Sequence, residues 1–291
     1  MDDVPLERLD DLWDYGDPAE SERRFAALLV RTRDDASGRY VAETLTQVAR
    51  AQGLQRRFED AERTLDEAEA ALRPGDHRSR SRVLLERGRV ANTAGREGRG
   101  SDRFLAAWEL ARSAGEDALA VDAAHMLGIV EPPDIARQWN ERAMELARSS
   151  SDADAQRWIG SLANNMAWAL HDTGDSEEAL ELFRIALAER ERQDDAVRTR
   201  IARWSVARCL RSLGRADEAL AEQRSLAHEL AAVDEIDGYV TEEIAECLLV
   251  LGRDDEARPF FARAYDELSA DDSLRAREPE RLERLHALGG A

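Results

Sequence analysis

The side chains that most often perform acid–base or nucleophilic chemistry are few in this chain and widely spaced. The five histidines are scattered, and only two cysteines, Cys209 and Cys247, are present. His171 and Asp172 are adjacent, a spacing that does not place them on one face of a helix. Because catalytic and metal sites need convergent partners, we expect structural or solvated roles for the histidines, with catalysis as the alternative.

Motifs that would bind a phosphate, a cofactor or a metal are missing from the sequence. A phosphate loop of the G-x-x-x-x-G-K-[ST] type needs a lysine, and all 41 cationic residues are arginines. Neither H-E-x-x-H nor C-x2-C occurs. We therefore predict a chain that is not an enzyme and holds no cofactor or metal. The alternative is an enzyme or a small-ligand regulator with a site near His125, Trp168 and His171.

The composition limits the possible fold classes and the possible kinds of partner. The 291 residues carry 61 acidic and 41 basic groups, a net charge of −20, which disfavours duplex nucleic acid and anionic membranes as partners. Apolar residues make up 43%, enough for a core, while aromatic residues make up only 5%. This balance, with few prolines, favours a helical protein over a β-sandwich.

The sequence also predicts the compartment. No stretch approaches about 18 uninterrupted apolar residues, and the residues from Met1 to Pro5 lack the apolar region of a secretory signal. Two cysteines are too few for a disulfide framework. We expect a cytoplasmic protein.

One spacing pattern recurs along the chain. Counted from Ala167, the offsets 3, 7, 12, 16 and 19 hold Leu170, Gly174, Ala179, Phe183 and Ala186. Counted from Ala245, they hold Leu248, Gly252, Ala257, Phe261 and Ala264. Related patterns start from five further anchors, with 36 to 43 residues between neighbours: Leu9, Ala49, Gly88, Ala124 and Ala207. Such self-similarity is typical of repeat architectures.

The offsets describe a helical hairpin. Residues at offsets 0 and 3 share a face of a first helix, and those at 12, 16 and 19 share a face of a second. The glycine at offset 7 ends the first helix, and the acidic residues after it favour the start of the second. One hairpin cannot bury its apolar face alone, so neighbours must stack into a solenoid.

This pattern resembles the tetratricopeptide repeat, which has a period of about 34 residues and an A-x3-F motif. Three segments carry the resemblance best: Ala179-x3-Phe183, Ala257-x3-Phe261 and Gly100-x3-Phe104. It extends from about Val4 to about Ala270. The resemblance implies an all-α fold, an α-solenoid wound as a right-handed superhelix of about seven hairpins with a C-terminal capping helix.

We expect a single solenoid domain over residues 1–291. The repeats are predicted at 4–34, 38–74, 78–114, 117–149, 153–193, 196–232 and 236–270, with the capping helix at 278–288. Two turns depart from the pattern: Arg56 replaces the glycine after Ala49, and Glu131-Pro132-Pro133 follows Ala124. The glycine-rich segment 95–100 is interpreted as a loosened hairpin turn rather than a domain boundary.

In the resembled family, the first helices line a concave surface where ligands usually bind, at offsets −6, −3, −2, +1, +4 and +5 from the anchors. The candidate peptide-binding residues in these rows are Arg50, Arg89, Asn92, His125, Asn164, Asn165, Trp168, His171, Trp204, Arg208 and Arg211. Arginine suits carboxylates, paired asparagines can bond a peptide backbone, and tryptophan supplies apolar area typical of binding hot spots.

The predicted function is therefore a non-catalytic adaptor that binds a peptide or helix with acidic groups in this groove. We expect a monomer or weak homo-oligomer, with no nucleic acid or membrane partner. An ordinary solvated face is the alternative, because Glu43, Glu86, Asp122 and Asp172 fall in the same rows and could pair with the arginines. End-to-end self-assembly is a third hypothesis, which the cap-like terminal units disfavour.

Cys209 and Cys247 each lie two residues after an anchor, where other repeats hold small or medium apolar residues. Buried core thiols are the favoured interpretation. A redox pair is the alternative, although first helices about 8–10 Å apart leave equivalent positions too distant for a disulfide.

Overall fold

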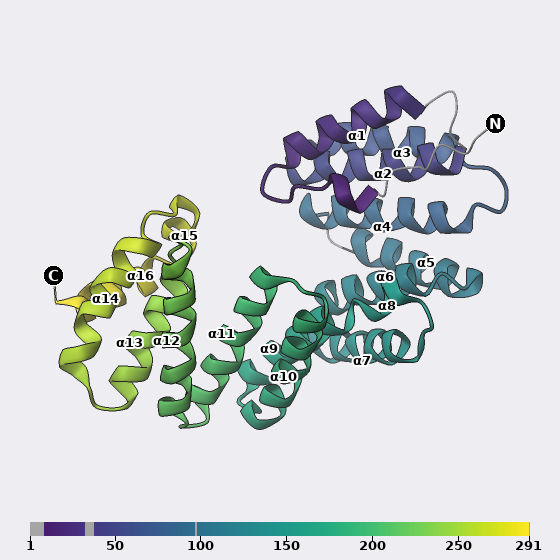
Figure 1. The fold of residues 1–291 in the computed structure, drawn as a ribbon. Helices are drawn as coiled ribbons and strands as arrows, with labels where there is room; N and C mark the ends of the chain where they lie inside the picture. The colour runs from purple at the N-terminus through teal and green to yellow at the C-terminus, as the bar shows by residue number, and fades with distance from the viewer. Residues whose placement is uncertain (1–8, 33–37, 97, 291) are drawn as a thin grey trace. The chain divides into compact units, whose positions relative to one another are not determined.

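The computed structural model describes residues 9–32, 38–96 and 98–290, and its regular structure within these ranges is helical, without a β-strand (Figure 1). The predicted all-α solenoid is confirmed. The chain divides into two compact units, one ending at Trp158 and one starting at Ile159, here called unit 1 and unit 2. The repeat boundaries stay predictions, and those at residues 4 and 34 lie outside the described residues.

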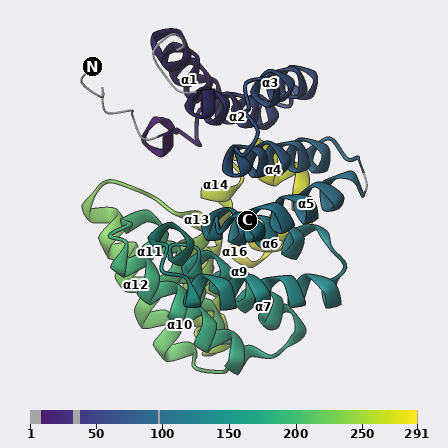
Figure 2. The same cartoon turned by 90° about the vertical axis from the view of Figure 1, so that its right-hand side faces the viewer.

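Unit 1 consists of a short 3₁₀ helix followed by hairpins (Figure 1 and Figure 2). After η1 (Leu9–Leu12) and α1 (Pro18–Thr32), α2 packs on α3, α4 on α5, and α6 on α7. The bounds are α2 (Gly38–Leu54), α3 (Phe58–Ala70), α4 (His77–Thr93), α5 (Arg99–Ala114), α6 (Asp117–Val130), α7 (Pro133–Ser149) and α8 (Ala153–Gln156).

Unit 2 repeats the arrangement. Here α9 packs on α10, α11 on α12, and α13 on α14, while the last helix, α16, covers α14. The bounds are α9 (Ile159–Thr173), α10 (Ser176–Arg192), α11 (Ala196–Ser212), α12 (Ala216–Ala232), α13 (Gly238–Val250), α14 (Asp254–Leu268), α15 (Asp272–Arg277) and α16 (Pro279–Gly289). Leu282 and Leu285 of α16 are buried in the unit 2 core, so this helix caps the last hairpin.

Several turns between paired helices contain a glycine in the left-handed conformation, as the repeat pattern predicts. Gly174, Gly214 and Gly252 end their first helices with φ of 91°, 76° and 70°, a left-handed conformation that only glycine adopts without strain. Arg56 takes the same place after α2 with φ of 62°, so this hairpin keeps its geometry at a backbone cost. The α6–α7 turn is different, because Glu131 is extended and Pro133 begins the next helix.

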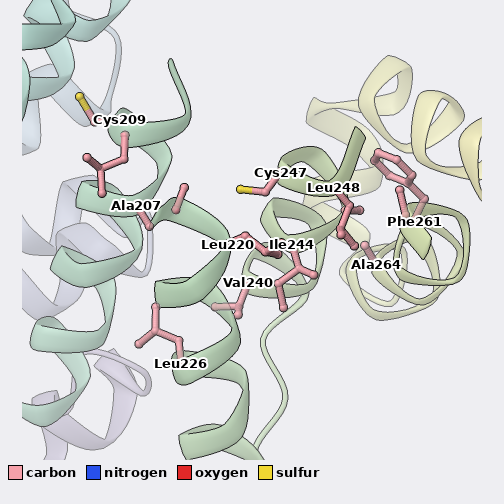
Figure 3. Packing of buried hydrophobic residues seen from close by; sticks show 14 of the residues in the cluster. Ala207, Cys209, Leu220, Leu226, Val240, Ile244, Cys247, Leu248, Phe261 and Ala264 are labelled. Atoms are coloured by element: carbon pink, nitrogen blue, oxygen red, sulfur yellow. The ribbon is translucent and has the colours of Figure 1, made fainter. Parts of the chain in front are cut away.

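The core places one aromatic ring against a small residue in each of several hairpins. Phe104, Phe183 and Phe261 are fully buried, as are the alanines at offsets 0 and 12 from the anchors in unit 2. Figure 3 shows the buried side chains around α13 and α14, Phe261 among them. In unit 1 the contact is tightest at Gly88, where an added Cβ atom would overlap the ring of Phe104.

The two thiols belong to this core. Cys209 on α11 and Cys247 on α13 are both buried and free (Figure 3). Cys209 Sγ donates to the carbonyl of Ser176 at 3.2 Å. Burial raises the pKa of both thiols, that of Cys247 to about 12. A thiol in this state is a poor nucleophile, which favours the structural interpretation.

Among the described helices, none is long and apolar enough to cross a membrane.

We expect Gly88→Ala to lower the free energy of unfolding by about 1–3 kcal/mol, because the added methyl group must displace the Phe104 ring. Gly53→Ala is the matched control. Its Cβ atom would lie 3.4 Å from Val90 Cγ2, an ordinary contact, and alanine favours a helix over glycine. Urea unfolding followed by circular dichroism measures both. Equal stabilities of the two variants would contradict the packing argument.

We also expect neither cysteine of the native chain to react with a thiol reagent such as Ellman's reagent at about pH 8, because burial keeps both thiols protonated. Both should react at once after denaturation, which serves as the internal control. Rapid release of chromophore from the native protein would show that one thiol is accessible and ionised.

Candidate functional site

Unit 2 presents a row of three aromatic rings from three consecutive first helices. We call Trp168 of α9, Trp204 of α11 and Tyr239 of α13 the aromatic row. The ring centroids of the two tryptophans lie 5.9 Å apart, and those of Trp204 and Tyr239 lie 6.3 Å apart. Trp168 also packs edge-on against the buried Phe183 at 4.9 Å. The aromatic row is therefore anchored in the core and still partly open to solvent.

The hydrogen bond of Trp204 holds its ring in place. Its Nε1 donates to the carbonyl of Tyr239 at 3.1 Å, which links α11 to α13. The guanidinium carbon of Arg208 lies 6.0 Å from the Trp204 ring, and that of Arg281 lies 5.0 Å from the Tyr239 ring. Both arginines are within the range of cation–π attraction. The surface thus combines rigid apolar area with flanking positive charge.

The arginines beside the aromatic row form ion pairs with buried carboxylates. Glu243 has a side chain only 2% exposed, and it accepts from Arg208 Nη1 at 3.0 Å and from Arg211 Nε. In the same way Glu242 accepts from Arg281, and Glu246 accepts from Arg284. Burial alone would lower the pKa of Arg211, but the hydrogen bond to Glu243 raises that pKa. These groups tie α11, α13 and α16 together.

Exposure differs between the two arginines on Glu243. The Arg208 side chain is 35% exposed, whereas Arg211 is mostly buried. Arg211 therefore serves to neutralise Glu243, and Arg208 still offers N–H groups to solvent. Sequence reasoning placed both arginines on this face and foresaw carboxylate pairing as the alternative, but it did not identify Glu243 as the buried partner.

The predicted residues of α9 lie on the face that carries Trp168. The side-chain amide of Asn164 donates to Asn165 Oδ1 at a long 3.5 Å. His171 packs against Trp168 with ring centroids 5.3 Å apart, and its Nε2 lies 2.8 Å from Ser212 Oγ on α11. The asparagine amides have spare bonding capacity, while His171 joins two helices.

The other four predicted peptide-binding residues lie on the first helices of unit 1. Arg50 of α2 and Arg89 of α4 both contact Glu86 Oε1, Arg50 at 3.5 Å, and Arg89 also donates to Asp122 of α6. Burial alone would lower the pKa of Arg89, but the charges of Asp122 and Glu86 raise it. Burial alone would raise the pKa of Asp122, but the charges of Arg89 and Arg50, together with the hydrogen bond from Arg89, lower that pKa.

A pocket of about 200 Å³ adjoins this charge network. Arg50, Glu86, Arg89 and the exposed Asn92 line it together with apolar side chains, including Met126. Glu86 Oε2 is buried there and has no hydrogen-bond partner among the described residues. The two arginines and the two carboxylates balance in charge, so this part of unit 1 is a neutral polar network rather than a free cationic patch.

His125 lies beside the network on α6. Its ring packs on Trp158 with centroids 5.2 Å apart, and its Nδ1 is buried without a partner in the described ranges. Burial lowers the pKa of His125, against the opposing charge of Asp122. Within the described residues, no group of three or more histidine, cysteine or carboxylate side chains could hold a metal ion.

Sequence reasoning missed Tyr239 of the aromatic row and several apolar residues next to that row. Ile201 and Tyr239 lie at offset −6 from their anchors, a row that the family pattern already places on the binding surface. Both are exposed, as are Val197 and Ile236 nearby. A search for large apolar residues in the −6 row would have found the first two.

Comparison with known proteins gives one family and a set of similar folds. Residues 160–267 match the family model described as tetratrico peptide repeat. No curated protein sequence matches the chain. The apo form of the quorum sensor NprR from B. thuringiensis is similar in structure, with 18% identity and a TM-score of 0.63, over 96% of this chain and 79% of that chain.

Two further structures are also similar to this chain. NprR in complex with its cognate peptide NprX has 19% identity and a TM-score of 0.51, over 96% of this chain and 81% of that chain. A tetratricopeptide repeat protein from Parabacteroides merdae has 14% identity and a TM-score of 0.50, over 98% of this chain and 97% of that chain. At these identities the likeness establishes the fold.

The lowered pKa of His125 predicts a pH effect on the stability of unit 1. As the pH falls through about 6.5, the unfolded chain takes up a proton at this residue before the folded chain does, so the free energy of unfolding decreases. His125→Gln should remove this loss, and its stability relative to the wild type should rise from about pH 7.5 to about pH 5.5. Urea unfolding at several pH values measures the difference.

The exposed His77 on α4 provides the control for this experiment. A rise of equal size in His77→Gln would show that the effect does not come from the burial of His125. A His125→Gln curve that runs parallel to the wild-type curve would show that His125 titrates alike in both states.

Proposed function

We propose that this tetratricopeptide-repeat protein is a non-catalytic interaction module that binds a peptide or a helix of another protein along the first helices of unit 2. The observation that carries the proposal is the aromatic row, because three consecutive hairpins each contribute one ring to a single surface. Rigid, partly exposed tryptophan and tyrosine side chains with flanking arginine are the residues that dominate binding hot spots.

The partner segment is proposed to carry acidic groups. Arg208 and Arg284 remain partly exposed after pairing with Glu243 and Glu246, whose side chains are buried. A guanidinium has five donors, so it can bind a second carboxylate through the N–H groups that its first partner leaves free. The amides of Asn164 and Asn165 add donors and acceptors at one side of the aromatic row.

The similar protein NprR supports a peptide-binding role, since its structure has been solved in complex with its cognate peptide NprX. The alternative of a small-ligand regulator or an enzyme has weaker support. The pocket beside the charged neighbours of His125 measures about 200 Å³, and two more open pockets measure about 540 Å³ and 440 Å³. None of the three is lined by His125, Trp168 or His171, where this alternative expects its site.

Selection from a display library of random 16-residue peptides against the full chain tests the proposal. We expect the selected peptides to be acidic and to lose at least about 30-fold in affinity with Trp204→Ala, since hot-spot residues contribute about 2 kcal/mol or more. Arg208→Gln should weaken the same peptides by about tenfold at low salt. Fluorescence anisotropy of labelled peptides gives the dissociation constants.

Trp108→Ala is the matched control, because Trp108 is also half-buried but lies on α5, a second helix of unit 1. Each variant is first compared with the wild type by circular dichroism. Selected peptides that bind Trp204→Ala as tightly as the wild type, or that lose affinity equally with Trp108→Ala, would contradict a binding surface on the aromatic row.

A further inference from the structure

An apolar patch extends the aromatic row toward the start of α11. We define it as Val197, Ile201 and Trp204 of α11, with Ile236 and Tyr239 from the turn and first residues of α13. Val197 and Ile201 are 57% and 54% exposed, and Ile236 and Tyr239 are also exposed. Large apolar side chains that stay exposed and lie together on one surface often mark a protein–protein interaction site.

The members of the patch are neighbours in space. Val197, Ile201 and Trp204 follow the i, i+4, i+7 spacing that places residues on one helix face. The rings of Trp204 and Tyr239 lie 6.3 Å apart, and an ion pair of 2.8 Å between Arg200 and Glu235 holds the turn that bears Ile236 beside α11. Two apolar rows therefore run side by side.

The chemistry of the patch favours a helical occupant over an extended one. An extended peptide needs partners for its backbone N–H and C=O groups. Trp204 Nε1 is already bonded to the Tyr239 carbonyl, and Ser205 Oγ is bonded to the Ile201 carbonyl. The remaining patch side chains are aliphatic except for the Tyr239 hydroxyl. A helix satisfies its own backbone and presents only its apolar face to such a surface.

Charge is distributed unevenly around the patch. At the Val197 end, the segments 194–200 and 233–237 contain Asp194, Asp195, Asp234, Glu235 and Asp237 against Arg198 and Arg200, a sum of 2 − 5 = −3. We call these two segments the acidic rim. At the other end, Arg208 is the partly exposed group, and its partner Glu243 is buried. The two ends thus favour opposite charges on an occupant.

We propose that the apolar patch docks one amphipathic α-helix of a partner protein, with a basic end of that helix on the acidic rim and an acidic end at Arg208. The inference rests on the proposed function and specifies its partner. It assigns the occupant a helical conformation, an apolar stripe with i, i+3, i+4, i+7 spacing and a direction along α11.

A synthetic probe tests the conformation and the direction. The probe is an 18-residue peptide with a leucine stripe at helical spacing, lysines on the polar face of one half and glutamates on that of the other. A second peptide has the same composition with the leucines moved off the stripe. We expect the full chain to bind the first peptide at least tenfold more tightly than the second, measured by fluorescence anisotropy.

Two exposure-matched variants locate the site. Ile201→Asp should weaken the striped peptide at least tenfold, because it places a charge in the centre of the patch. Ile129→Asp on α6 changes a residue with 55% exposure in unit 1 and should leave binding unchanged. Equal binding to the wild type and Ile201→Asp, or no preference for the striped peptide, would overturn the proposal.

Photo-crosslinking determines the direction in which the bound peptide lies along α11. A benzoylphenylalanine at the lysine end should attach to residues 233–237, and one at the glutamate end should attach to the part of α11 near Arg208. The reverse pattern would overturn the assigned direction.

The library-selected peptides separate this inference from the proposed function. If those peptides depend on Trp204 but tolerate a central proline, the interaction surface stands and the helical occupant is wrong. If they do not depend on Trp204, both are wrong.

Discussion

The close approach of the two helices in each hairpin is the constraint on which the rest of the structure depends. In the α4–α5 hairpin the small anchor Gly88 faces the ring of Phe104, and the ring fills the space that the missing side chain leaves. The α9–α10 and α13–α14 hairpins carry Phe183 and Phe261 at the equivalent position. This contact fixes the rotation of each first helix about its own axis. Trp168, which follows the anchor Ala167, therefore lies at the edge of the core against Phe183 and remains partly exposed.

The sequence predicts the hairpins because their determinants are local. Glycine at the turn, alanine at the anchor and phenylalanine 16 residues later act within one hairpin, so a repeated spacing is enough to recognise them, and even Arg56 adopts the left-handed turn expected at its position. The carboxylate partners of Arg208 and Arg211, in contrast, are not determined within one hairpin. They depend on how far α13 lies from α11 and on which rotamer each side chain takes, and neither follows from a spacing. The pattern therefore predicted the row of residues but not the burial of Glu243 beneath it.

The acidic residues of unit 2 and its arginines are paired with one another. Three of the carboxylates of unit 2, on Glu242, Glu243 and Glu246, are largely buried, and a buried charge is tolerated only with hydrogen-bonded partners. Arginine suits this role because its planar fork can bond one carboxylate and still offer donors elsewhere. Arg281 in this way contacts both Glu242 and Glu278. The same groups that hold α16 against α13 also leave guanidinium edges open to solvent.

The positions of the tryptophans have a spectroscopic consequence. Of the six in the chain, only Trp168 and Trp204 belong to unit 2, and both are members of the aromatic row. Indole rings 5.9 Å apart and tilted by 36° couple their electronic transitions, so the pair forms a chromophore in its own right. The ultraviolet dichroism of this couplet depends on the relative orientation of α9 and α11. The protein thus carries an intrinsic optical probe at the surface where its partner is proposed to bind, without any attached label.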